Sequence, residues 1–297
     1  MNLYNGWLIV DKPKGASSND AVQKVKRLVG KANKVGHAGT LDPLAQGVLP
    51  IAIGEATKTV QYMMDATKEY EFDVSWGEER ITGDAEGEII AKSNNIPDIK
   101  DIEGILPEFI GEISQMPPIY SALKINGQPA YKLARKGEEV KLAPRKIKIE
   151  NFRLIDHNQE RAVSRFKVLC GKGTYVRSLA VDIAKALLTC GYVSYLKRTK
   201  VGNFFINDAI MLANLMNIVH NDEIQKHLLP VTYGLGDILA IEVSADQVRF
   251  LRNGVQIFLQ NHSQTSKQLV QILEQGVLQA IACMDKGLCR PIRVFNL

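Results

Sequence analysis

The chain has 297 residues, of which 45% are hydrophobic and 23% charged, and these ordinary values for a globular protein exclude a disordered chain. At about 150 residues per domain, the length suggests about two domains. Lysine and arginine number 37 against 32 for aspartate and glutamate, and this mild excess is compatible with a polyanionic partner without requiring one.

No targeting or metal-binding signal stands out in the sequence. The apolar runs are far shorter than the ~18 residues that span a membrane, and residues 1–10 lack the basic and apolar regions of a signal peptide. Cysteines and histidines are scattered, without Cys-x-x-Cys or His-x-x-x-His pairs. We therefore expect a cytoplasmic protein with reduced cysteines, no metal site and no membrane association.

Apolar residues recur at helical or alternating spacing along the chain, which predicts its main elements. Between residues 6 and 76, the expected elements are a strand at 6–10, a helix from an N-cap at Ser17 or Ser18 to Gly30, a glycine-rich loop at 36–47, a strand at 48–53, a helix at 55–64 and a half-buried strand at 70–76. Further along, they are a helix at 99–109, strands at 147–149 and 166–170, and a helix through Leu179 and Leu187 that ends at Gly191.

These elements show no regular strand–helix repeat, which argues against a Rossmann or barrel fold. The pattern favours an α+β fold around a mixed, largely antiparallel sheet with flanking helices. A boundary is expected near residues 233–240, because strand-like runs at 278–283 and 291–295 follow it. We therefore predict one domain at residues 1–238 and a small β-rich domain at residues 239–297.

The segment most suggestive of chemistry is residues 36–49, Gly-His-Ala-Gly-Thr-Leu-Asp-Pro-Leu-Ala-Gln-Gly-Val-Leu. It gathers His37, Thr40 and Asp42 just before a buried strand, and loops at strand ends often carry functional side chains. It is not a phosphate loop, because no Gly-Lys-Ser/Thr follows. A glycine-rich turn in which Asp42 caps a local bend explains the same residues, so the pattern alone leaves both interpretations open.

Three further segments combine glycine, proline, aromatic and basic residues, at positions 115–124, 171–178 and 195–202. In an extended backbone, Tyr175 and Arg177 would project to the same face. Taken singly, each segment is also compatible with an ordinary solvated surface, as is the basic helix around residues 24–34.

Taken in order, these segments resemble the bacterial tRNA pseudouridine-55 synthases of the TruB family. The matching stretches cover most of residues 6–235 and lie at 7–18, 36–43, 54–58, 68–70, 117–124, 173–177 and 196–199. The string His-Ala-Gly-Thr-Leu-Asp-Pro is highly specific. One departure is Arg-Ile-Thr at residues 80–82, where the family usually carries a Thr-Asp-Thr type of segment, before a matching stretch at 84–87. No catalytic residue is expected there, so we expect an effect only on local packing or on a minor RNA contact.

The resemblance implies a group of three catalytic residues. Asp42 would be the essential carboxylate, Tyr70 would stack on the base, and Arg177 would keep a desolvated Asp42 charged. The implied substrate-binding residues are His37, which would enter the RNA arm as the nucleotide leaves, Tyr175 and Leu196, which would line the pocket, and Lys12 and Pro13, which would support the active-site loop.

By the same resemblance, the expected reaction converts uridine 55 in the T-arm loop of tRNA to pseudouridine. The reaction is redox-neutral and consumes no energy donor, so no cofactor is expected. The uridine must be flipped out of the folded arm, and the basic stretches at 24–34 and 197–200 would hold phosphates. The expected partner is the T-arm stem-loop, bound by a cytoplasmic monomer without an obligatory protein partner, and a small PUA-like RNA-binding domain would follow.

Other classes of function remain open on the sequence alone. One is a non-catalytic RNA-binding or RNA-chaperone protein on the same fold, against which the intact Asp42 argues. Another is a related pseudouridine synthase that acts on rRNA or within a guide-RNA complex. An enzyme for small molecules has no cofactor or metal motif in its favour.

Overall fold

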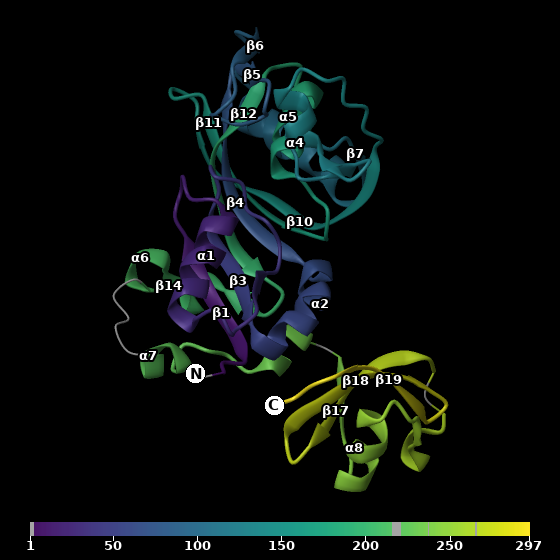
Figure 1. Ribbon diagram of the computed structural model, residues 1–297. Helices are drawn as coiled ribbons and strands as arrows, with labels where there is room; N and C mark the ends of the chain where they lie inside the picture. Colours follow the sequence, from purple (N-terminus) through teal and green to yellow (C-terminus); the bar gives the residue numbers. More distant parts are fainter. Residues whose placement is uncertain (1–2, 216–220, 237, 265) are drawn as a thin grey trace.

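A ten-stranded mixed sheet forms the centre of the larger part of the molecule (Figure 1). The computed structural model describes residues 3–215, 221–236, 238–264 and 266–297. Along the sheet the strands are β14 (Ile210–Met211), β1 (Gly6–Lys12), β3 (Gln46–Ile53), β12 (Gly191–Val201), β4 (Lys68–Trp76), β11 (Val163–Cys170), β10 (Arg145–Asn158) and β7 (Gly111–Gln115), with β2 (Val35–His37) beside β3 and β13 (Phe204–Phe205) beside β12.

The pairing of these strands is largely antiparallel. Strand β14 runs parallel to β1, and β12 runs parallel to β3, whereas the other described pairs of this sheet are antiparallel. The described helices are α1 (Ser18–Val29), α2 (Val60–Asp65), α3 (Ile99–Ile105), α4 (Ala130–Arg135), α5 (Val176–Ala186), α6 (Leu212–Leu215), α7 (Asn221–Gln225) and α8 (Ala245–Arg252). The predicted α+β fold is thus confirmed. None of the described helices is long and apolar enough to cross a membrane.

Helix α1 begins at a capping box. The Ser17 hydroxyl accepts a hydrogen bond from the Asp20 amide at 3.1 Å, and the Asp20 carboxylate accepts one from the Ser17 amide at 2.9 Å. Gly30 closes the helix with φ +83°. The predicted helix bounds are confirmed, and of the two candidate serines the N-cap is Ser17. The hydroxyl of Ser18 is therefore not used for capping.

Helix α5 ends earlier than predicted. Its last residue is Ala186, and Leu188 then takes a left-handed conformation with φ +54°. Gly191, predicted to end the helix, is instead the first residue of β12. A Cβ atom there would lie 3.0 Å from a methyl group of Val74 and 3.1 Å from Cβ of Ala184, so this glycine permits close packing of β12 against its neighbours. The predicted helices at 55–64 and 99–109 are each partly 3-10, with 3-10 turns at Gly54–Thr59 and Leu106–Phe109.

The core beneath the sheet contains a cluster of aromatic rings from neighbouring strands. Phe72 on β4 and Phe166 on β11 stack with ring centroids 5.4 Å apart, and Trp76 meets Phe166 edge-on. Phe72 and Trp76 alternate with more exposed residues along β4, as the period-two pattern predicted. This packing fixes β4, which carries part of the site described below, against β11.

The remaining described strands form two short hairpins and one further sheet. Two hairpins are β5 (Glu78–Arg80) with β6 (Ile89–Lys92), and β8 (Lys124–Ile125) with β9 (Gln128–Pro129). A five-stranded C-terminal sheet has the order β15 (Leu239–Glu242), β17 (Gln268–Glu274), β18 (Val277–Asp285), β19 (Leu288–Val294) and β16 (Ile257–Phe258), with α8 packed on it (Figure 1). The predicted β-rich C-terminal part is confirmed, while the boundary between residues 238 and 239 stays a prediction.

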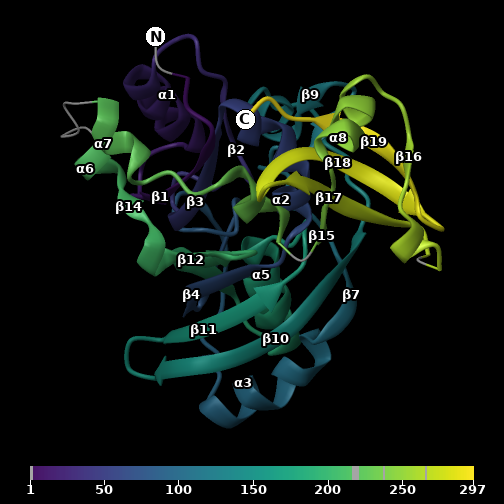
Figure 2. The ribbon, with the colours of Figure 1, turned by 90° about the horizontal axis from the view of Figure 1, so that it is seen from below.

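The C-terminal sheet is anchored to the larger part of the molecule next to α2 (Figure 2). Leu278 of β18 and Phe295, which follows β19, belong to the same apolar cluster as Trp7 of β1. The ammonium group of Lys58 donates a hydrogen bond to the Val294 carbonyl at 2.8 Å. The Gly-Glu-Ala-Thr-Lys segment at residues 54–58 therefore helps to hold the C-terminal sheet in place.

Candidate active site

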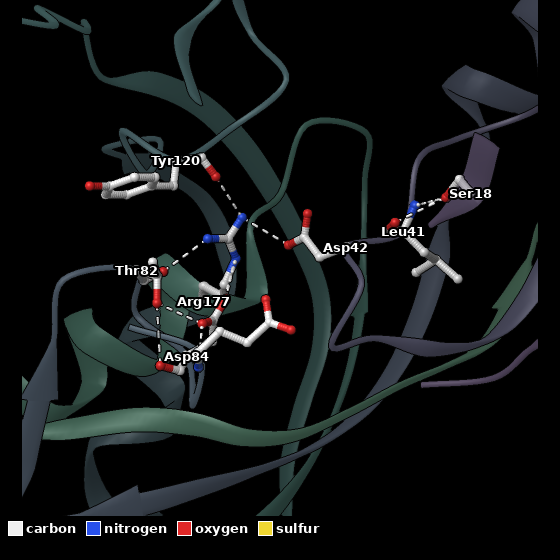
Figure 3. Close-up of polar contacts among 8 residues, drawn as sticks. Ser18, Leu41, Asp42, Thr82, Asp84, Tyr120 and Arg177 are labelled. Carbon is white, nitrogen blue, oxygen red and sulfur yellow. Dashed lines mark hydrogen bonds and ion pairs between the residues drawn. The ribbon is translucent and has the colours of Figure 1, made fainter. Parts of the chain in front are cut away.

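The loop that carries Asp42, here called the Asp42 loop and defined as residues 38–45, connects β2 to β3. The hydroxyl of Ser18 accepts a hydrogen bond from the Leu41 amide at 2.8 Å and donates one to the Leu41 carbonyl at 2.9 Å (Figure 3). The Gly15 amide donates to the Pro43 carbonyl at 2.7 Å. The loop is therefore fixed by its backbone on both sides of Asp42.

The side chain of Asp42 does not cap a local bend, which was the alternative interpretation of this loop. Its backbone carbonyl accepts the Ala45 amide at 3.1 Å, while its carboxylate Oδ2 lies 2.8 Å from Nη2 of Arg177 (Figure 3). The Asp42 side chain is 39% exposed and that of Arg177 only 5%. The expectation of a desolvated carboxylate was therefore wrong for the RNA-free protein, in which the guanidinium is the buried member of the pair.

Arg177 has more hydrogen-bond and ion-pair partners than Asp42 has. It donates to the carbonyl oxygens of Thr82 and Tyr120, each at 2.9 Å, and its Nε lies 3.5 Å from Oδ2 of Asp84. The Asp84 side chain is only 4% exposed, and its other oxygen accepts the Thr82 hydroxyl at 2.6 Å (Figure 3). Two carboxylates thus share one buried guanidinium, one on the buried side and one on the open side.

The segment around Asp84 contacts the site through Arg177, whereas the departure at residues 80–82 was expected to affect only local packing or a minor RNA contact. Thr82 lies within the departure from the family pattern, yet it contacts Arg177 through its backbone carbonyl, which any residue there would supply. Asp84, which the sequence analysis did not single out, is the buried partner of the guanidinium. The only signal for it in the sequence was its place in the matching Asp-Ala-Glu-Gly stretch.

Tyr175 and Arg177 reach the same cavity, although not by the predicted route. Tyr175 is extended, with φ −105°, and is the N-cap of α5, whereas Arg177 lies in the first helical turn. Gln115, at the end of β7, accepts the Tyr175 amide at 2.9 Å and donates to its carbonyl at 3.2 Å. The turn into the helix, rather than an alternating strand, brings the two side chains together.

A cavity of about 370 Å³ lies against the Asp42–Arg177 pair, within the usual size range of ligand pockets. The loop, β4, β12 and the start of α5 each contribute to its wall. Among its lining residues are Asp42, Tyr70, Tyr175, Arg177, Leu196 and Arg198. The structure thus brings together the three predicted catalytic residues and two of the predicted binding residues.

A second hollow, of about 450 Å³, lies against the same ion pair and shares Asp42 and Arg177 with the first. His37 lines this hollow, together with Tyr131 and Arg135 of α4. Burial, together with the nearby Arg198 charge, lowers the pKa of His37, so the imidazole is neutral at pH 7. His37 is not among the residues that line the first cavity, which contains Tyr70.

Lys12 and Pro13 line neither hollow. Lys12 is fully buried, and its ammonium group donates to the carbonyls of Ala16 at 2.7 Å and Pro43 at 3.5 Å. Burial lowers its pKa to about 8. Lys12 thus contacts the Asp42 loop at Pro43, and its role as a support for that loop stays a prediction. Pro13 is exposed beside it.

Arg198 is a second buried guanidinium, and the expectation that it holds an RNA phosphate was wrong. It is 1% exposed, and it donates to the Val48 carbonyl at 2.8 Å and to the Gly39 carbonyl at 3.0 Å. Gly47 has φ +101°, and a Cβ atom there would lie 2.2 Å from the Arg198 carbonyl oxygen. Arg198 therefore holds the start of the Asp42 loop at Gly39, and β3 just after the loop at Val48.

Tyr70 faces the cavity beside Arg198. Burial raises the pKa of Tyr70 above its ordinary value, and the positive charge of Arg198 opposes this shift without reversing it. The phenol is therefore protonated at neutral pH and can donate a hydrogen bond. Among the described residues, no group of three or more His, Cys, Asp or Glu side chains is placed to hold a metal ion.

Solved structures with a similar fold include chains of two assemblies. A chain in the structure titled "Crystal Structure of a Cbf5-Nop10-Gar1 Complex" has a TM-score of 0.74 and 25% identity, covering 98% of this chain and 84% of that chain. A chain in an H/ACA RNP bound to a substrate RNA containing 2′-deoxyuridine has a TM-score of 0.75 and 22% identity, covering 98% and 85%. The fold is thus that of the pseudouridine synthases.

Family models and curated relatives define the family. The model described as the TruB family pseudouridylate synthase N-terminal domain matches residues 26–176, and that of the tRNA pseudouridylate synthase B C-terminal domain matches residues 177–236. The tRNA pseudouridine synthase B of Ehrlichia ruminantium is 42% identical, covering 98% of this chain and 99% of the relative, and that of Caulobacter vibrioides is 43% identical, covering 100% and 97%. The chain belongs to the TruB family of pseudouridylate synthases, which are isomerases.

Proposed function

We propose that this protein converts uridine 55 in the T-arm loop of tRNAs to pseudouridine. The observation that carries the proposal is the Asp42–Arg177 pair at 2.8 Å, set against a cavity that Tyr70 and Leu196 also line. The relatives at 42% and 43% identity are named tRNA pseudouridine synthases, which supports tRNA as the substrate.

The reaction breaks the bond between uracil N1 and ribose C1′ and joins C1′ to C5 of the turned base. The proton at C5 is lost and N1 gains one, so atoms balance without an oxidant or a co-substrate. Asp42 supplies the charged carboxylate for this exchange. Arg177 holds its Oδ2, which leaves Oδ1 to face the nucleotide. Tyr70, protonated at neutral pH, stacks on the base and can donate a hydrogen bond.

The two hollows on either side of the ion pair fit a flipped nucleotide and the arm that it leaves. The uridine enters the cavity with Tyr70, while His37 in the second hollow faces the vacated loop. Exposed basic residues of α1 and the turn after it, Arg27, Lys31 and Lys34, lead toward His37 and would hold phosphates. The C-terminal unit at residues 239–297 would add RNA contacts outside the catalytic domain at 1–238.

The enzyme would act in the cytoplasm as a monomer, without cofactor and without a protein partner. The isomerisation is redox-neutral, so the chemical step requires no cofactor. The alternative of a guide-RNA enzyme rests on the fold shared with a chain of the Cbf5-Nop10-Gar1 complex. Activity of the protein alone on an isolated T-arm stem-loop would favour our proposal over this alternative.

The test is to incubate purified protein with unmodified tRNA in excess EDTA and to map pseudouridine by a chemical adduct and primer extension. We expect one new stop, which reports pseudouridine at position 55. Modification elsewhere, or only of rRNA, would favour the related synthases. Tight binding with no pseudouridine would favour an RNA chaperone.

Lys197 and Arg198, adjacent on β12, offer a matched pair for testing how the basic stretch works. Arg198→Met leaves two carbonyl oxygens without their donor, and we expect a loss of about 1–3 kcal/mol in the free energy of unfolding together with a slower reaction in single-turnover assays. Lys197→Met, at a partly exposed position, should change mainly tRNA affinity. Urea titration and single-turnover rates check both. If Arg198→Met loses tRNA affinity but keeps its single-turnover rate, Arg198 binds an RNA phosphate after all.

A further inference from the structure

Two adjacent serines at the start of α1 do different work. Ser17 is partly exposed and forms the capping box with Asp20. Ser18 is 3% exposed, and its hydroxyl makes both of its hydrogen bonds to Leu41 of the Asp42 loop (Figure 3). Since the helix is already capped, the hydroxyl of Ser18 is free to serve the loop.

The contact lies directly beside the reacting carboxylate. One hydroxyl satisfies both the amide and the carbonyl of Leu41, whose side chain is 4% exposed, and the next residue is Asp42. Fixing both polar groups of Leu41 limits the rotation of the peptide planes that set the direction of the Asp42 side chain. The other described supports hold Gly39, three residues before Asp42, and Pro43, on the opposite side of Asp42 from Leu41.

We propose that Ser18 is a positioning residue for pseudouridine formation: its hydroxyl locks Leu41 and thereby aims the Asp42 carboxylate at Arg177 and the cavity. The inference rests on the proposed function of Asp42. Ser18 touches no reacting atom, so its contribution is the placement of Asp42 within the distance that the chemical step requires.

The test compares Ser18→Ala with Ser17→Ala and Ser18→Thr. Ser18→Ala should lower the single-turnover rate at saturating enzyme by about 10- to 100-fold, the scale of a misplacement of about 1 Å, and leave tRNA affinity nearly unchanged. Ser17→Ala removes the cap and should lower thermal stability while the rate at saturation stays near that of the wild type. Ser18→Thr keeps the hydroxyl that bonds Leu41, so most of the rate should return.

A second readout does not depend on activity. Hydrogen exchange at the Leu41 amide should be about fivefold or more faster in Ser18→Ala than in the wild type, the equivalent of one lost hydrogen bond, and should be normal in Ser17→Ala. Faster exchange together with a slower reaction supports the proposal. A wild-type rate in Ser18→Ala, or an equal loss of rate in Ser17→Ala, overturns it. If the wild type itself forms no pseudouridine, the proposed function fails, whereas the exchange data still report whether Ser18 fixes the loop.

Discussion

An Asp42→Asn enzyme should bind tRNA within about tenfold of the wild type and form pseudouridine slower by about 10⁴-fold or more. Asparagine keeps the size of the side chain but loses the charge and the nucleophilic oxygen. The amide can still accept a hydrogen bond from Arg177, so the loop should hold its place. Single-turnover assays of pseudouridine, with binding measured separately by filter retention, check the result.

Asp101→Asn provides a matched control, because Asp101 is an exposed aspartate on α3, outside both hollows. It should behave as the wild type in both assays. Appreciable turnover by purified Asp42→Asn would remove Asp42 from the chemistry, while a loss of binding equal to the loss of rate would show that Asp42 mainly holds RNA.

Arg177→Met should be the second most damaging change. It removes the guanidinium from between Asp42 and Asp84 and leaves the buried Asp84 charge unpaired, which typically costs about 3–5 kcal/mol of stability. Arg177→Lys keeps the charge, but one ammonium cannot reproduce the planar contacts to both carboxylates and two carbonyls, so it should be impaired as well. Urea titration measures the stability, and single-turnover kinetics measure the chemistry.

The double variant Arg177→Met with Asp84→Asn separates the two roles of the arginine. Neutralising Asp84 removes the unpaired buried charge, so much of the lost stability should return. The reaction should remain slow, because Asp42 still lacks its partner. A double variant that regains both stability and the wild-type rate would show that Arg177 serves only the fold.

Local patterns in the sequence predicted local structure well. The alternation along β4 and the capping signals of α1 report burial and hydrogen bonding within a few residues, so they survive without tertiary information. The Asp42 loop likewise stands out by composition. The end of α5 was missed because a glycine is needed at position 191 for a different reason. There β12 packs closely against Val74 of β4 and Ala184 of α5, and neither contact is visible in the local sequence.

The missed site residues have a common cause: their environment is made by distant parts of the chain. Arg198 lies in a basic run that resembles surface, yet its side chain bonds carbonyls about 150 residues earlier, as at Val48. Asp84 meets Arg177, which lies far along the chain on α5. Whether a charge is buried and paired is a tertiary property, so neither residue could be assigned from its neighbours in sequence.

This chain alone, through Asp42, is expected to move the glycosidic bond of one uridine from N1 to C5. The most direct measurement uses a T-arm stem-loop with tritium at C5 of its uridines, incubated with purified protein in EDTA. Because C5 must lose its hydrogen to form the new bond, we expect release of tritium equivalent to one uridine per stem-loop. Asp42→Asn, or replacement of uridine 55 by cytidine, should abolish this release. Absence of release from a bound, folded stem-loop, or equal release by Asp42→Asn, would contradict this expectation.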